Sequence, residues 1–584
     1  MSAGGGPGAP YRYDPSAFRR VFERHFTHLA GVHRNSHRYA RRPALHDPAT
    51  GRRWTYAQLW ADSGRLADGL AQAGVGRGDV VVISLYNCPE FVLSWLAALR
   101  LGAIAAPINF RLAAGEVAHI LDDSRPRAFI HDAGLAGVAA DALSRAEHEP
   151  ALVATVGAHG EGVAHGAATA HGAATAHAAA TAHGAATAHR GGVALEQLID
   201  AGDADAIPPL PDGVSCYDET TRLYTSGTTG MPKGVSLSGV VDALSAHDVI
   251  MHFPLSPEDR TLNMTPWFHR GGLYSGGPNP VLYCGAEAVA LRAFDAATVL
   301  DWVAEHRLTF LIGAPTNLAL LAAEQSARPR DLSALRGIVT MGAPLDREAC
   351  LRYQRTLTPR IFNGYGTTEA FWNTFLRPED LPEHAGSAGR ACTDDDVAVV
   401  RIYEDRPAEP SDHAAKDGAE VGEVIVRSVK AGYAYVNNDV EQAARFRDGW
   451  LYIGDLATWD EDEYVTIVGR RDDMIISGGE NIHPVQVEAA LAEHPQVADA
   501  AVVGLPDERW GELVVAYVVA TDPGLDAAAC DAHCRAHPML SSFKRPRAYR
   551  FVDELPLTAT GKKLHYRLRE QVVRDAAAGL LRRP

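Results

Sequence analysis

The segment YTSGTTGMPKG at residues 224–234 combines residue types that suit the binding of phosphate groups. Its glycines let the backbone turn tightly and approach a ligand closely, and Lys233 adds a positive charge beside several hydroxyl groups. A loop of this kind after an expected strand can hold a polyphosphate. It is not a Walker loop, because Pro232 stands where that motif requires its second glycine. The candidate ligand residues are Thr225, Ser226, Gly227, Thr228, Thr229, Gly230 and Lys233.

A second motif, NGYGTTE at residues 363–369, offers an aromatic ring and a carboxylate within a few positions. Tyr365 lies between two glycines, so its ring can lie against the face of an adenine. The carboxylate of Glu369 is an oxygen ligand of the kind that Mg²⁺ prefers. A lone motif of this kind is normally a plain turn, so its interpretation as a site for a magnesium-bound nucleotide depends on its order behind the first motif.

Two further stretches carry charged residues that could act on the same nucleotide. Asp455, in GWLYIGDL, comes at the end of an expected strand, where a buried carboxylate can accept hydrogen bonds from both ribose hydroxyls. Lys562, in TATGKK near the C-terminus, supplies an ammonium group. Such a group can bring a carboxylate and an α-phosphate together and stabilise the charge that develops on phosphorus.

In this order, the motifs resemble those of the acyl- and aryl-CoA synthetase superfamily of adenylate-forming enzymes, over roughly residues 20–575. The resemblance implies that ATP and Mg²⁺ bind here, with Tyr365 stacked on adenine, Thr368 at the phosphates and Glu369 on the metal. It also implies a nucleotide contact from Arg470 and from the ribose-binding Asp455. The other residues expected to bind the cofactors are Gly342, Ala343, Pro344, Asn363, Gly366, Gly478 and Gly479.

The resemblance further implies a reaction in two steps: an acid is adenylated with release of pyrophosphate, and the thiol of coenzyme A then displaces AMP. Asp472 aligns with a hinge about which a small C-terminal domain rotates between the steps. One face of that domain presents Lys562, and the other presents the loop SGGENI at 477–482. The residues expected to act in catalysis are Thr225, His269, Glu369 and Lys562.

The segment MTPWFHRGGL at residues 264–273 resembles the stretch with which the acyl pocket of these enzymes begins. A detailed likeness to 4-chlorobenzoate:CoA ligases, carried by YGTTEA at 365–370 and DDMIISGGENIHP at 472–484, favours a benzoate or cinnamate as the small aromatic acid. Arg270 is unusual at its position. It either reads a phenolate or second acid group or is a surface arginine that covers the pocket mouth. The residues expected to bind the substrate are Trp267, Phe268, His269, Arg270 and Gly364.

The elements that must position these motifs alternate between apolar strands and amphipathic helices up to about residue 460, which predicts an α/β fold. Leucines at helical spacing predict one such helix from Thr55 to Gly74. A chain of 584 residues exceeds what one hydrophobic core supports. We therefore predict an adenylating N-terminal domain over 17–471 and a small mobile α/β lid over 472–584. The resemblance implies that the first domain contains layered α/β sheets and a distorted β-barrel.

Two segments are expected to lie outside this architecture. Residues 1–16 are rich in glycine and proline and are predicted to be disordered. Residues 159–190 carry histidines every six positions in near copies of AHGAAT. We interpret them as a disordered surface loop rather than a metal site, because this composition cannot pack a core and the spacing does not match one helix face. A cysteine and histidine cluster from Cys530 to His537 is interpreted as a packed helix face.

Composition excludes several classes of protein. A net charge of −17 argues against a nucleic-acid partner, because phosphate backbones are bound by basic surfaces. Seven scattered cysteines do not form a disulfide framework and favour the cytoplasm. The longest apolar stretch, residues 91–110, is interrupted by Arg100 and Pro107. It is expected to form a buried helix and a strand, not a membrane span.

The sequence leaves alternatives for the acceptor of the activated acid. The acid could pass to the phosphopantetheine arm of a carrier protein, or ATP and nitrite could diazotise an amino-substituted aromatic acid. Arg270 and Gly239, which stands where many members carry a histidine, keep the second alternative open. A binding protein without activity, whose histidine repeat sequesters metal, is disfavoured by the intact Glu369, Asp455 and Lys562.

Overall fold

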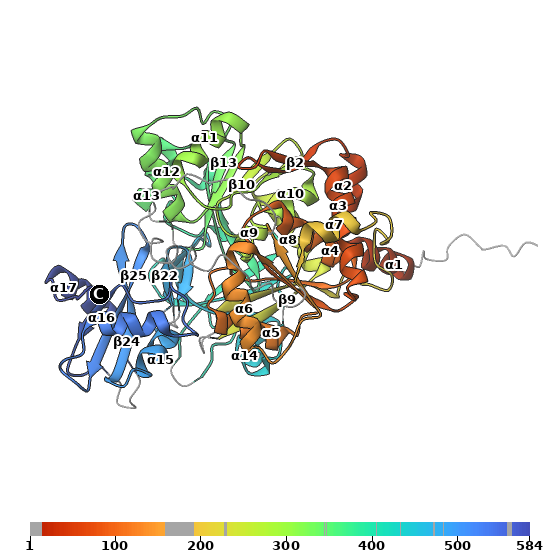
Figure 1. The fold of residues 1–584 in the computed structure, drawn as a ribbon. Coiled ribbons are helices and arrows are strands. Elements are labelled where there is room, and N and C mark those ends of the chain that lie inside the picture. Colours follow the sequence, from red (N-terminus) through yellow and green to blue (C-terminus); the bar gives the residue numbers. More distant parts are fainter. Residues whose placement is uncertain are drawn as a thin grey trace, which may run out of the picture.

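The computed structural model describes residues 15–157, 192–226, 231–343, 345, 347–403, 406–432, 434–470, 474–482, 484–556, 563 and 565–584. Its elements form a large N-terminal α/β region and a small C-terminal α/β domain, which is blue in Figure 1. This arrangement confirms the predicted fold. Helix α1 begins at Pro15, so the prediction of disorder up to residue 16 is wrong for its last two residues. The histidine repeat at 159–190 lies outside the described residues.

Two mixed sheets form the layered part of the N-terminal region, and both are mainly parallel. In the first, the neighbours are, in order, β7 (Val193–Ala194), β6 (Leu152–Val156), β5 (Ala128–Asp132), β3 (Val80–Ser84), β4 (Ile104–Pro107), β8 (Glu219–Ser226) and β9 (Pro232–Ser238). In the second, they are β16 (Arg390–Ala391), β15 (Phe371–Leu376), β14 (Ile361–Thr367), β13 (Gly337–Met341), β12 (Phe310–Gly313), β10 (Arg260–Asn263), β11 (Glu287–Val289), β1 (Pro43–Asp47) and β2 (Arg52–Thr55).

Helices cover these sheets, so the parallel strands are buried on their faces and read as apolar runs. The described helices of the region are α1 (Pro15–His25), α2 (His28–Arg38), α3 (Tyr56–Gln72), α4 (Pro89–Arg100), α5 (Ala114–Ser124), α6 (Ala136–Arg145), α7 (Leu195–Ala201), α8 (Gly239–His252), α9 (Arg270–Tyr274), α10 (Pro278–Cys284), α11 (Ala296–His306), α12 (Pro315–Ala327), α13 (Arg347–Thr356) and α14 (Asp439–Arg445), with the 3₁₀ turns η1 (Ala133–Leu135) and η2 (Pro378–Asp380).

A third, antiparallel sheet is the curled part of the N-terminal region and corresponds to the distorted barrel that the resemblance implied. Its strands are β17 (Asp395–Val400), β18 (Gly422–Ser428), β20 (Trp450–Trp459), β19 (Phe446–Arg447) and β21 (Val465–Arg470), which pairs with β20. Apolar residues of β17, β18 and β20 fill its own core.

The C-terminal domain has a fourth sheet with helices packed against it. The described elements are β22 (Ile475–Ser477), β23 (Glu480–Ile482), α15 (Pro484–Ala492), β24 (Val497–Asp507), β25 (Gly511–Ala520), α16 (Ala527–Ala536), β26 (Ala548–Phe551) and α17 (His565–Ala577). Cys530 and Cys534 of α16 lie in the core of this domain, so the interpretation of that cluster as a packed helix face is confirmed for both cysteines. In Figure 1, α15 lies on the side of the domain nearest α5 and α14.

Candidate active site

The phosphate loop joins two strands of the first sheet. Strands β8 and β9 form an antiparallel hairpin in which Thr225 is paired with Lys233, so the backbone on both sides of the loop is held rigidly. Residues Gly227, Thr228, Thr229 and Gly230 and the side chain of Ser226 lie outside the described part of the chain.

Lys233 connects the phosphate loop to the curled sheet. Its Nζ atom lies 2.9 Å from Oε2 of Glu441 on α14, and the lysine side chain is almost completely buried. Burial opposes ionisation of Glu441, but the hydrogen bonds and charges of Lys233 and Arg445 outweigh it and lower the pKa of Glu441. The predicted phosphate contact of Lys233 stays a prediction.

The second motif follows strand β14 into a turn, and the glycines in it permit close packing. A side chain at Gly366 would overlap the carbonyl oxygen of Phe371, and one at Gly364 would overlap the indole of Trp372. The Nδ2 atom of Asn363 donates to the carbonyl oxygen of Ser387 over 3.2 Å. This segment is therefore fixed against strand β15.

Two of the predicted nucleotide residues meet although they are far apart in the sequence. The hydroxyl of Tyr365 donates to Oδ2 of Asp455 over 2.8 Å, and the carboxylate of Asp455 is buried. Strand β14 carries the tyrosine, whereas β20 of the curled sheet carries the aspartate. Gly342, at a φ of +83°, and Ala343 follow the neighbouring strand β13. Pro344 lies outside the described residues.

Glu369 is held by residues that the sequence analysis did not identify. The hydroxyl of Tyr435 donates to Oε1 of Glu369 over 2.6 Å, and the amide of Gly432 donates to the carbonyl oxygen of Glu369 over 2.8 Å. Among the residues that the structure describes, Oε2 of Glu369 accepts no hydrogen bond. One carboxylate oxygen is thus oriented and the other is available, a donor arrangement that fits Mg²⁺. No local sequence signal connects positions 369 and 435.

The segment that begins the predicted acyl pocket forms a row of aromatic rings. Trp267 is buried in the hydrophobic core against Phe91. The ring of Phe268 meets Phe110 edge to face at 5.3 Å, and the ring of His269 lies 4.1 Å from that of Phe268. Of Trp267, Phe268 and His269, only His269 has a substantially exposed side chain.

Arg270 is buried, so its interpretation as a surface arginine is wrong. Its guanidinium donates to the carbonyl oxygens of Thr368 (3.2 Å) and Lys430 (3.1 Å) and to the hydroxyl of Ser245 (3.0 Å). Burial lowers the pKa of Arg270. The structure therefore connects Arg270 to the backbone beside Glu369, and the predicted contact of Arg270 with substrate stays a prediction.

The C-terminal domain brings its glycine loop to His269. Oε2 of Glu480 lies 3.7 Å from Nε2 of His269, and its carboxylate also accepts hydrogen bonds from Asn109 and Arg111. Burial favours the neutral form, yet the hydrogen bonds and charges of His269 and Arg111 prevail and lower the pKa of Glu480. Gly478 and Gly479, both at positive φ, form the turn before it. Glu480 belongs to a motif that the sequence identified, but its own role was missed.

The predicted catalytic lysine and hinge, Lys562 and Asp472, lie outside the described residues, as does the side chain of Arg470. The neighbouring Lys563 is described. Its Nζ atom lies 2.9 Å from Oδ1 of Asp499 and 3.3 Å from Oε2 of Glu488, both within the C-terminal domain. The ammonium of Lys563 is therefore held by carboxylates of its own domain.

A buried cluster of possible metal ligands lies near the pocket segment, formed by Asp248, His252 and Cys392. The Nζ atom of Lys430 lies 2.9 Å from Oδ1 of Asp248 and 3.0 Å from Oδ2 of Asp395. The ammonium of Lys430 therefore forms ion pairs with a carboxylate of this cluster and with Asp395, so the cluster belongs to a buried ion-pair network.

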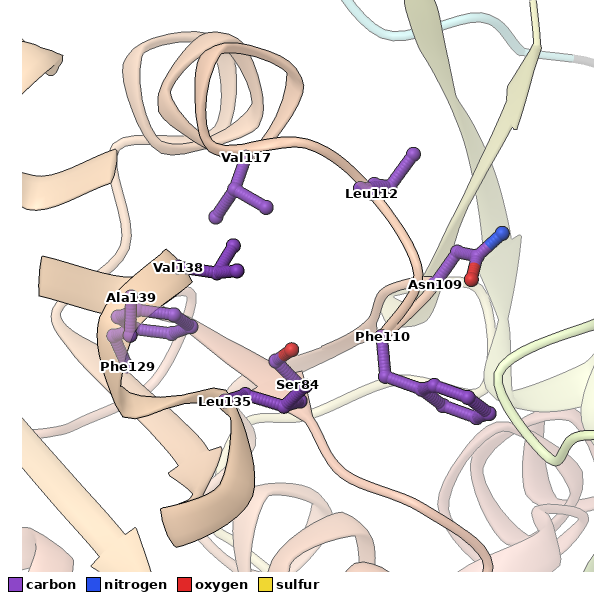
Figure 2. Close-up of a pocket in the computed structure, with 9 residues that line it drawn as sticks. All are labelled: Ser84, Asn109, Phe110, Leu112, Val117, Phe129, Leu135, Val138 and Ala139. Carbon is purple, nitrogen blue, oxygen red and sulfur yellow. The ribbon is translucent and has the colours of Figure 1, made fainter. Parts of the chain in front are cut away.

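A cavity of about 230 Å³, counted with its opening to solvent, lies at the carboxyl ends of β3 and β5 (Figure 2). Figure 2 shows mainly apolar side chains around it. Asn109 and Phe110 line one side and also face the glycine loop and the pocket segment, respectively. None of the phosphate-loop or adenine-motif residues that the structure describes lines this cavity.

Among the helices of the described part of the chain, none combines the length and the apolar character that a membrane crossing requires.

Comparison with known proteins agrees with this geometry. Residues 32–435 match the AMP-binding enzyme family and residues 486–562 match the AMP-binding enzyme C-terminal domain. An indoleacetate–CoA ligase from Aromatoleum aromaticum is 34% identical, over 89% of this chain and 93% of that protein. A 4-chlorobenzoate–CoA ligase from an Arthrobacter species is 32% identical, over 93% of this chain and 95% of its own.

Among solved structures, a double mutant of o-succinylbenzoate CoA synthetase from Bacillus subtilis, bound to a product analogue, superposes with a TM-score of 0.76. Its sequence is 27% identical, and the superposition covers 92% of this chain and 98% of the chain of that structure. The match extends through both domains. The chain therefore belongs to the AMP-binding enzyme family and is an AMP-forming acid–coenzyme A ligase, an adenylate-forming enzyme that activates a carboxylic acid with ATP.

Proposed function

We propose that this ligase activates an aromatic carboxylic acid of the benzoate or cinnamate type and transfers it to coenzyme A. The observation that carries the proposal is the meeting of distant motifs at one site. Tyr365 reaches Asp455 from another sheet, and His269 of the pocket segment meets Glu480 of the C-terminal domain.

In the first step, an oxygen of the substrate carboxylate attacks the α-phosphorus of ATP, the new P–O bond forms, and pyrophosphate leaves. We assign Tyr365 to stacking on the adenine ring and Asp455 to accepting hydrogen bonds from the ribose hydroxyls. Glu369, oriented by Tyr435, would hold Mg²⁺. When bound, the metal neutralises charge on the phosphates. Thr225, Lys233 and Lys562 are assigned to the phosphates and to the developing negative charge.

In the second step, the thiol sulfur of coenzyme A attacks the carbonyl carbon of the acyl adenylate. The C–S bond forms, the bond to the phosphate oxygen breaks, AMP leaves and the thiol proton is released. Gly478 and Gly479 form a turn at positive φ that carries no side chains, and we assign this turn to the approach of the thin thiol-bearing chain. The structure has this face of the C-terminal domain turned toward His269.

The aromatic nature of the acid is supported by the surroundings of His269 and by the relatives. The rings of Phe110, Phe268 and His269 form a continuous row, and offset or edge-to-face contacts with a substrate ring are favourable there. Two relatives that cover most of the chain are named for indoleacetate and 4-chlorobenzoate.

The test is acid-dependent exchange of pyrophosphate into ATP, measured with benzoates, cinnamates, aminohydroxybenzoates and fatty acids. We expect exchange with aromatic acids and, on addition of coenzyme A, an aryl thioester and one AMP per turnover. Preference for fatty acids would refute the aromatic assignment. Thioester formation only with a carrier protein, or product formation only with nitrite and an arylamine, would replace coenzyme A as the acceptor.

A further inference from the structure

Glu116, in the first turn of helix α5, is a fully buried carboxylate at the interface between the two domains. From its own domain it receives one hydrogen bond, from the amide of Ala113 to Oε2 over 3.0 Å. A buried carboxylate is costly unless a positive charge and further donors compensate it. In the N-terminal region that the structure describes, no such cation contacts Glu116.

The compensating groups all come from the C-terminal domain. The ammonium of Lys544, which is only 2% exposed, donates to Oε1 of Glu116. The hydroxyl of Ser541 donates to Oε2, and Nε2 of Gln486 lies 3.1 Å from Oε1. Lys544 also donates to Oε1 of Gln486 over 2.8 Å. Within the described chain, Glu116 and Lys544 are each other's only ionic partners.

The same segment of the C-terminal domain caps helix α5. The amide of Gly115 donates to the carbonyl oxygen of Pro538 over 3.2 Å, and the amide of Ala113 donates to Ser541 Oγ over 3.1 Å. Helix N-termini leave amide groups without intrahelical partners, so the bond from Gly115 satisfies a donor that the helix itself cannot. A side chain at Gly115 would overlap the side chain of Met539, which would have to move to make room for it.

In the structure, this contact occurs together with the contact between Glu480 of the glycine loop and His269, so both belong to one orientation of the C-terminal domain. Lys563, next to the proposed adenylating lysine, is held by Asp499 and Glu488 instead, and no described contact connects it to Glu369 or Asp455. One orientation cannot serve both faces. We propose that Glu116 and Lys544 are positioning residues that hold the C-terminal domain in the orientation used for thiol transfer. This inference rests on the two-step reaction proposed above.

Removal of one partner tests the proposal, because the other is then left as an unpaired buried charge in this orientation alone. The variants are Glu116→Gln, Lys544→Met and the double variant that carries both changes. A matched control is Asp396→Asn, which removes a carboxylate from an exposed ion pair with Arg427 on the curled sheet. The two half-reactions are measured separately: pyrophosphate exchange with the acid, and thioester formation from supplied aryl adenylate and coenzyme A.

We expect each single variant to slow thioester formation by roughly tenfold or more, with pyrophosphate exchange unchanged or faster. The double variant should recover most of the lost rate, since neutral groups of similar size leave no unpaired charge. Hydrogen–deuterium exchange gives a readout without activity. The amides of residues 113–117 should exchange faster in the single variants than in wild type, and Asp396→Asn should change neither measurement.

Equal losses in both half-reactions, or unchanged amide exchange at 113–117 in the single variants, would overturn the proposal. The failure of the proposed function looks different. If wild-type protein shows no acid-dependent pyrophosphate exchange, the assigned reaction is wrong. Amide exchange then decides whether the Glu116–Lys544 contact holds the domains together, and unchanged protection would refute that as well.

Discussion

At the scale of single residues, the site depends on side chains that orient other side chains. Glu369 is the proposed metal ligand, yet its carboxylate is aimed by Tyr435, which follows strand β18 of the curled sheet. Burial, and then the charge of Glu369, raise the pKa of Tyr435 well above its ordinary range. The phenol therefore stays a hydrogen-bond donor at every physiological pH.

Tyr435→Phe should weaken the use of magnesium without removing it. Loss of the donor leaves Glu369 free to rotate, and outer partners of this kind typically contribute about tenfold or more to metal affinity. The Mg²⁺ concentration for half-maximal pyrophosphate exchange should rise by about that factor. Tyr452→Phe, which removes a buried hydroxyl bonded to Ala408 in the same curled sheet, is the control and should leave the requirement unchanged. If Tyr435→Phe leaves the Mg²⁺ concentration for half-maximal exchange unchanged, the tyrosine contributes only to packing and does not orient Glu369.

Arg270→Met should destabilise the N-terminal region. The change removes a charged donor from Thr368, Lys430 and Ser245, whose oxygens stay buried, and a loss of about 2–4 kcal/mol is expected for such a network. Arg270→Lys should lose a similar amount of stability, because one ammonium cannot donate hydrogen bonds in the planar arrangement of a guanidinium. Urea unfolding followed by circular dichroism measures the loss. Arg427→Met, at an exposed arginine, should stay within about 0.5 kcal/mol of wild type.

At the scale of elements, helix α2 joins the N-terminal segment to α10 through a buried histidine. Nε2 of His28 lies 2.8 Å from the carbonyl oxygen of Asn279, and its ring is 1% exposed. Burial lowers the pKa of His28 from 6.5 to about 4, against the smaller effect of this hydrogen bond. His28 is therefore neutral in the folded protein at a pH where the unfolded chain is protonated.

The stability that depends on His28 should be fully present above pH 6.5 and be lost as the pH falls toward 4. In this window the unfolded state binds the proton and the folded state does not, so protonation favours unfolding. The loss approaches ~3 kcal/mol for a shift of this size. Urea unfolding of wild type and His28→Gln at pH 7 and pH 5 measures it. The wild type should lose more stability than the variant; parallel losses would assign the acid sensitivity to other groups.

Local sequence patterns predicted the helices and strands well, but they could not predict contacts between elements that are distant in the sequence. The helix expected from Thr55 is α3, which Thr55 and Gln58 begin with a capping box, a signal that lies within four residues. The bond from Tyr435 to Glu369 joins positions with no shared motif. The sequence left two alternatives for Arg270, a contact with an acid group of the substrate and a surface position at the pocket mouth, and it gave no sign of the partners that bury this residue. Only the fold brings three backbone and hydroxyl oxygens to it.

At the scale of the whole molecule, we propose that the C-terminal domain works through two faces that a single orientation cannot use together. The face with Gly478, Gly479 and Glu480 meets His269 in the structure. The other proposed face carries Lys562, beside the described Lys563. Two successive reactions at one nucleotide site are then accounted for by a domain rotation, in which a few hinge residues absorb the change.

Lys562→Ala should separate the two half-reactions. Without this ammonium, charge on the α-phosphorus lacks its proposed partner, so acid-dependent pyrophosphate exchange should fall by about 100-fold or more. Thioester formation from supplied aryl adenylate should continue near the wild-type rate, since it uses the face that already meets His269. Lys563→Ala is the matched control, because its ammonium is held by Asp499 and Glu488. If the two alanine variants behave alike, or if Lys562→Ala slows both steps equally, the assignment of separate faces to separate steps is wrong.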